Sequence, residues 1–152
     1  MFTEAKLFQI LDSAVKDISH RVAKTDVVNV PDVNQISAAN PCSIFTKTTG
    51  DYKLMVVLCA DYDVLKEMTR NMKHGMEASE EDVSVYMREF FNIFCGHVVS
   101  AMNQCQHLKA YFDVPSFIFG TNEVLSDAKL KFHGRYYYKS EYGSLALEAL
   151  YN

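Results

Sequence analysis

The sequence has no long apolar run, no excess of basic residues, and no repeat or low-complexity stretch. No segment approaches the ~20 consecutive apolar residues that a membrane-spanning helix needs. The formal net charge is −4, which argues against nucleic acid or an anionic membrane as partner, because both are bound by basic surfaces. Residues 1–6 carry an early acid and a lysine among their apolar residues, so no signal peptide is expected. We therefore predict a cytoplasmic protein with no nucleic-acid or membrane partner.

Cysteine is scarce, and no two cysteines have the CxxC spacing. The four are Cys42, Cys59, Cys95 and Cys105. A metal site built from helix cysteines and neighbouring histidines is an alternative, but Cys95 and Cys105 point about 80° apart on a helix and do not converge with His97. We expect reduced, mostly buried thiols, no metal site and no bound cofactor.

What the chain does have is an ordinary globular composition, with 49% hydrophobic and 22% charged residues over 152 residues. Such a chain is long enough to bury a core, so we predict a single domain over 1–152. Apolar residues at helical spacing predict helices over 4–22 and 61–73. Ser79 and Asp82 fit a capping box that opens a third helix, running to about residue 106.

The remaining segments predict β-structure. A strand and a loop are expected over 26–40, and a hairpin over 42–58. A short strand is expected over 115–120, and a second hairpin is formed by 128–139 and 143–150. The fold class is therefore α+β, with long helices packed on a largely antiparallel β-sheet. If the C-terminal hairpin lies at a sheet edge, strand pairing across a two-fold axis offers a route to a homodimer.

Three consecutive tyrosines, residues 136–138, allow two interpretations. They could stack single-stranded nucleic acid, but basic residues do not surround them. Tyr136 and Tyr138 share one side of a strand, so packing beneath a helix is the simpler hypothesis.

The third helix has one broad apolar face and an unusual opposite face. The apolar sector comprises Val83, Met87, Phe90, Phe91, Phe94, Val98, Ala101, Met102 and Cys105. The opposite sector comprises Val85, Glu89, Asn92, Gly96, Val99 and Asn103, with Ser100 at its edge. A solvated helix face is usually rich in lysine, glutamate, glutamine and arginine, so this mixture is more typical of a contact surface.

Asn92 and Gly96 are poor helix formers, which leaves two explanations for their presence. Asn92 could bridge to a nearby loop while Gly96 admits the N-terminal helix. Alternatively, both could present the helix backbone and an amide to another molecule.

Glu89 and Asn92 are followed, after twenty-two further residues, by Pro115. In this pattern the sequence resembles the CheC/CheX family of chemotaxis phosphatases. Members share Asp or Ser, then Glu four positions later, Asn three positions after that, and Pro after twenty-two further residues. Glu89, Asn92 and Pro115 stand at those intervals. Val85 departs from the pattern, because it occupies the Asp/Ser position. The first helix lacks the second Glu-x-x-Asn of CheC-type members, so the chain is most similar to the single-site CheX type, which is typically dimeric.

The resemblance implies an enzyme that removes the phosphoryl group from the aspartyl phosphate of a CheY-type receiver domain. It implies that Asn92 orients the attacking water and that Glu89 pairs with a receiver lysine. The partner-binding positions would be Val85, Gly96, Val99 and Asn103. Mg²⁺ would be held by the receiver and not by this chain. The wider family also contains flagellar-switch components that only bind partners, so a non-catalytic receiver-binding adaptor is the alternative.

Overall fold

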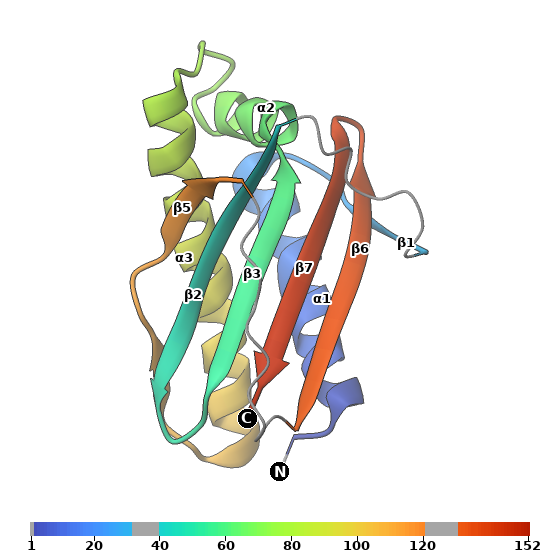
Figure 1. The fold of residues 1–152 in the computed structure, drawn as a ribbon, viewed down its shortest axis with the longest axis vertical. Helices are drawn as coiled ribbons and strands as arrows, with labels where there is room; N and C mark the ends of the chain where they lie inside the picture. The colour runs from blue at the N-terminus through green and yellow to red at the C-terminus, as the bar shows by residue number, and fades with distance from the viewer. Residues whose placement is uncertain (1, 32–39, 121–130) are drawn as a thin grey trace.

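In the computed structural model, three helices pack on one face of a seven-stranded antiparallel sheet within the described residues (Figure 1). The structure describes residues 2–31, 40–120 and 131–152. The helices are α1 (Glu4–Ala23), α2 (Tyr62–Met72) and α3 (Glu80–Gln106). The strands are β1 (Val28–Val30), β2 (Pro41–Gly50), β3 (Leu54–Asp61), β4 (Ala110–Phe112), β5 (Ser116–Phe119), β6 (Phe132–Ser140) and β7 (Gly143–Tyr151). The predicted α+β class with helices on an antiparallel sheet is confirmed.

The three helices begin and end close to their predicted positions. The capping box at the start of α3 is present: the Ser79 hydroxyl accepts from the Asp82 amide at 3.1 Å, and the Asp82 carboxylate accepts from the Ser79 amide at 3.0 Å. Lys73, just after α2, donates to the same carboxylate at 2.6 Å. Gly75 follows with φ +89°, a conformation that glycine adopts without strain. These contacts fix the joint between α2 and α3.

Both predicted hairpins are present, and they meet in the middle of the sheet. β2 pairs with β3, β6 pairs with β7, and β3 also pairs with β7. The strand order is β1-β6-β7-β3-β2-β4, with β5 pairing with β2 beside β4. β4 was not predicted, because its three residues are too short to show an alternating pattern. Parts of the segments predicted over 26–40 and 128–139 lie outside the described residues.

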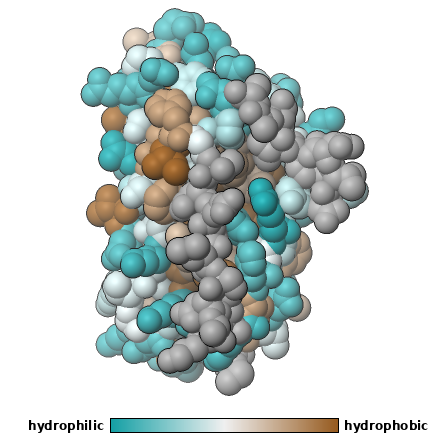
Figure 2. All heavy atoms as spheres, viewed as in Figure 1, coloured by the Kyte–Doolittle hydropathy of each residue, from teal (hydrophilic) through white to brown (hydrophobic). Residues whose placement is uncertain are grey.

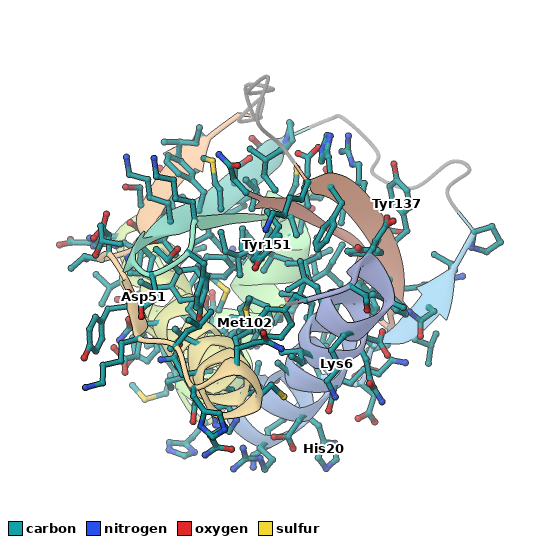
Figure 3. All side chains as sticks on the ribbon, turned by 90° about the horizontal axis from the view of Figure 1, so that it is seen from below. Lys6, His20, Asp51, Met102, Tyr137 and Tyr151 are labelled. Atoms are coloured by element: carbon teal, nitrogen blue, oxygen red, sulfur yellow. The ribbon has the colours of Figure 1, made fainter. Side chains whose placement is uncertain are left out.

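The hydrophobic core lies between the sheet and the helices. In the view along the helices (Figure 3), α1 and α3 lie beneath the sheet, and Met102 of α3 and Tyr151 of β7 fill the space between the layers. The tyrosine pair of β6 also faces the helices. Tyr136 packs against Phe8 of α1 at 4.7 Å between ring centroids, and Tyr138 is fully buried. The predicted packing of these tyrosines beneath a helix is confirmed.

None of the helices in the described residues is both long enough and apolar enough to cross a membrane.

Candidate functional site

The two faces of α3 are those expected from its sequence. The buried residues are Val83, Met87, Phe90, Phe91, Phe94, Cys95, Val98 and Met102. Cys105 is a correction: it was placed in the apolar sector, but it is exposed. Cys105 lies in the last turn of α3, two residues before His107, which leaves the helix in a left-handed conformation. The other three cysteines are buried.

Glu89 and Asn92 lie on the exposed face of α3, and both side chains are exposed. Being three residues apart on a helix, they are neighbours on its surface. Within the described residues, neither side chain forms a hydrogen bond or ion pair. The Asn92 amide and the Glu89 carboxylate are therefore adjacent on the surface, and no described residue binds either group.

Gly96, one turn after Asn92, is exposed and has open space around it. A Cβ atom added there would meet no heavy atom within 4 Å in the described part of the chain. The hypothesis that Gly96 admits the N-terminal helix is therefore wrong. Asn92 likewise makes no bridge to a described loop, so neither residue is explained by packing within the described chain.

The four positions expected to surround the contact differ in their accessibility. Val85 is 48% exposed, and Gly96 is open. Val99 is half-buried and packs against the core. Asn103 is also half-buried, and it is engaged within the chain: its amide nitrogen donates to the Ala110 carbonyl at 3.2 Å, and its oxygen accepts from the Tyr52 hydroxyl at 3.0 Å. The structure thus gives Asn103 a structural role, joining α3 to the β2–β3 turn and β4.

A groove of about 490 Å³ runs between α1 and α3, on the side of α3 that carries His97. Ile10 and Ala14 of α1 and Ala101 of α3 line it. Its one carboxylate, Asp17, is hydrogen-bonded to Arg21 at 2.7 Å, and this bond lowers the pKa of Asp17. On α3 the groove is lined by His97, the residue that follows Gly96 in the sequence. The sequence could not reveal it, because it depends on the spacing between two helices.

On the other flank of α3 lies β5, directly after the buried Pro115. Figure 1 shows β5 beside the upper half of α3, with β2 on its other side. Phe119, at the end of β5, is 52% exposed. Sequence analysis placed Phe119 in a short strand but could not show this exposure, which follows from the position of β5 in the sheet.

The buried thiols are poorly suited to nucleophilic chemistry. Burial raises the pKa of Cys42 to about 11, and burial also raises the pKa values of Cys59 and Cys95. A thiol must ionise to attack, so these cysteines are inert near neutral pH. The described residues also include no group of three or more histidine, cysteine, aspartate or glutamate side chains that could hold a metal ion.

Comparison with protein families gives one match. Residues 42–133 match the family described as "Chemotaxis phosphatase CheX". These residues include nearly all of β2, and β3, α2, α3, β4 and β5 in full, and therefore the exposed Glu89–Asn92 face. Among curated proteins, none matches the chain.

Solved structures share the fold over nearly the whole length. The chemotaxis protein CheX from Vibrio vulnificus is 12% identical, with a TM-score of 0.81 and 100% of each chain covered. CheX from Desulfovibrio desulfuricans is 14% identical, with a TM-score of 0.79, covering 97% of this chain and 99% of the other. A third is the CheX–CheY–BeF₃–Mg²⁺ complex from Borrelia burgdorferi, at 13% identity and TM-score 0.70, covering 96% and 97%. At such identities the likeness concerns the fold.

Proposed function

The chain belongs to the CheX family of chemotaxis phosphatases, and on that premise we propose that it hydrolyses the aspartyl phosphate of a CheY-type receiver domain. The observation that carries the proposal is the Glu89–Asn92 pair on α3, exposed and without a partner among the described residues, next to the open Gly96. The Borrelia CheX structure with CheY supports a receiver as partner. The whole chain is proposed to act as one domain.

Asn92 is proposed to orient the attacking water. An acyl phosphate is already activated, so the catalyst needs chiefly to position a nucleophile in line and to stabilise charge. A carboxamide suits this task, because its oxygen accepts a hydrogen bond from water, its nitrogen can donate one, and it does not titrate. Because Asn92 is exposed on a rigid helix, it can enter a partner's active site without rearrangement of this chain.

Glu89 is proposed to pair with a lysine of the receiver. A carboxylate one turn from the amide fixes the rotation of the helix relative to the partner, which aligns the water for attack. Gly96 lets the receiver approach the helix backbone closely. Mg²⁺ is proposed to stay on the receiver, since the described residues of this chain lack a suitable ligand cluster.

The test is dephosphorylation of a phosphorylated CheY-type receiver in the presence of Mg²⁺, timed with wild-type protein, Asn92→Ala and Glu89→Ala. Asn92→Ala is expected to reduce the rate to that of the receiver alone while binding is largely retained. Glu89→Ala is expected to weaken association about tenfold, the usual scale for losing one charged hydrogen bond. Glu141→Ala, an exposed acid in the turn between β6 and β7, is the matched control and should remain active.

Full activity of Asn92→Ala would overturn the proposed mechanism. Unchanged affinity of Glu89→Ala would remove the lysine contact. If the wild-type protein binds the receiver but never accelerates phosphate loss, the chain is the non-catalytic adaptor instead.

A further inference from the structure

Three aromatic side chains form a cluster at the sheet edge next to α3. We call Tyr62, Phe117 and Phe119 the aromatic edge. The ring centroids of Tyr62 and Phe119 are 6.0 Å apart, and those of Phe117 and Phe119 are 5.4 Å apart in an edge-to-face arrangement. Phe119 is 52% exposed although it packs on two rings. Figure 2 looks onto the other face of the sheet, the one turned away from the helices, where hydrophobic residues also gather at the upper left, near β5.

Register places these rings on the helix side of the sheet. Phe119 pairs with Cys42 and Phe117 with Ile44, and both β2 residues belong to the core beneath the helices. Side chains alternate along a strand, so Phe117 and Phe119 face the same side as α3. The aromatic edge therefore flanks α3 and does not lie on the opposite face of the sheet.

The aromatic edge is bordered by acid. Glu80 begins α3, and its carboxylate adds to the effect of burial in raising the pKa of Tyr62. Glu80 and Glu81 are both exposed in the first turn of α3. An exposed aromatic ring beside a carboxylate is complementary to an apolar side chain with a basic neighbour.

The size of a protein interface brings this cluster within reach of a partner that docks on Asn92. A standard interface covers about 800 Å² per partner, or a circle of about 16 Å radius. At 1.5 Å per residue, such a footprint extends about ten residues along α3 on either side of Asn92. It therefore extends to about Asp82 near the start of α3 and toward the flank where β5 contacts the helix. Glu80, about 18 Å from Asn92 along the helix, lies at the rim of this footprint.

We propose that the aromatic edge is a second contact area for the receiver domain, occupied in the same complex that brings Asn92 to the aspartyl phosphate. This inference rests on the proposed function. The receiver would present an apolar side chain against Phe119 and a basic group toward Glu80. Buried aromatic anchors carry much of the binding energy of an interface, so the aromatic edge would select among receivers, while Glu89 and Asn92 serve the reaction.

The experiment measures kcat and KM for dephosphorylation of a phosphorylated CheY-type receiver by wild-type protein, Phe119→Ala, Glu80→Lys and Asn92→Ala. Phe119→Ala is expected to raise KM five- to tenfold with kcat retained, and Glu80→Lys is expected to raise KM as well. Tyr111→Ala is the matched control. Tyr111 is an exposed aromatic residue, 66% accessible, on β4 beyond the C-terminal end of α3, and its loss should leave KM unchanged.

The outcomes separate the two proposals. An unchanged KM in Phe119→Ala, with Asn92→Ala inactive, overturns the aromatic edge as a receiver contact and leaves the proposed function intact. An active Asn92→Ala overturns the proposed function itself. A Phe119→Ala variant that changes its molar mass in light scattering without a change in KM shows that the aromatic edge joins copies of this chain, which also overturns the inference. Circular dichroism on each variant confirms that it is folded.

Discussion

At the scale of single residues, Gly96 lowers the stability of its helix and leaves the helix surface open. A glycine inside a helix is about 1 kcal/mol less favourable than alanine, and α3 continues for ten residues beyond it. Nothing in the described part of the chain uses the missing side chain, because an added Cβ would meet only open space. No contact within the described chain therefore offsets this cost, which agrees with the proposal that a receiver approaches the helix backbone at Gly96.

Replacing Gly96 should separate stability from activity. Gly96→Ala is expected to raise the free energy of unfolding by about 0.5–1 kcal/mol, measured by urea denaturation. It should also raise KM for the phosphorylated receiver, and Gly96→Leu should raise it further, because the larger side chain keeps the receiver from the backbone. Gln104→Leu, at an exposed position near the C-terminal end of α3 and away from the aromatic edge, should leave KM unchanged. If Gly96→Leu retains the wild-type KM, Gly96 is not in the contact.

At the scale of elements, a carboxylate joins three segments that are distant in sequence. Asp12 of α1 accepts hydrogen bonds from the Tyr138 hydroxyl of β6 at 2.8 Å and from the Asn29 amide of β1 at 2.9 Å. Lys16 bonds the same carboxylate at 3.1 Å and also reaches the Asn29 side chain. Because β1 contributes only three residues to the sheet, these bonds are a main link between it and α1.

The stability contributed by Asp12 should depend on pH. Burial raises the pKa of Asp12, but the hydrogen bonds from Asn29, Tyr138 and Lys16 outweigh it and lower the pKa below 3.8. A carboxyl whose pKa is lower in the folded state stabilises above its unfolded pKa, and that contribution is lost as pH falls through the folded pKa.

Asp12→Asn is accordingly expected to cost about 1–3 kcal/mol at neutral pH. The free energies of unfolding of the variant and of wild type can be measured by urea denaturation from pH 7 to pH 3. Their difference should be constant above about pH 5 and should become smaller below pH 4. Asp17→Asn, which breaks an exposed pair with Arg21, is the control and should change stability little at any pH. If the difference in unfolding free energy between Asp12→Asn and wild type does not become smaller in acid, the proposed role of the Asp12 charge is contradicted.

The helices could be predicted from sequence because their information is local. Ser79 and Asp82 mark the start of α3, and apolar spacing alone identifies the face that carries Asn92. β4 could not be predicted, since it exists only by pairing with the end of β2. The hydrogen bond between Asn103 and Tyr52 could not be predicted either, because Tyr52 lies 51 residues away in the chain. The sequence thus locates the candidate pair but not the flanks that surround it.

At the scale of the whole molecule, the two edges of the sheet differ. α3 and β5 lie along one edge, and β6 and β1 lie toward the other (Figure 1). β1 pairs with β6 only over Tyr137–Lys139, so among the described residues no strand covers Phe132–Tyr136 on the side away from β7. An uncovered strand edge is a template for pairing with a second chain. β7, by contrast, lies between β6 and β3, so within the predicted C-terminal hairpin only β6 can serve as a dimer edge.

We therefore predict a homodimer formed by β6 pairing with its copy across a two-fold axis, which leaves the Glu89–Asn92 face of each chain free. Light scattering should give about 35 kDa, twice the chain mass of 17.3 kDa. In a Cys105→Ser background, which removes the exposed thiol, Arg135→Cys should form an intermolecular disulfide on oxidation, whereas His20→Cys on α1 should not. A monomer mass would refute the dimer, and a dimer without the Arg135→Cys crosslink would place the interface elsewhere. The two-fold axis would then lie away from β6. In that case the strand order would no longer imply that the Glu89–Asn92 face of each chain is accessible in the dimer.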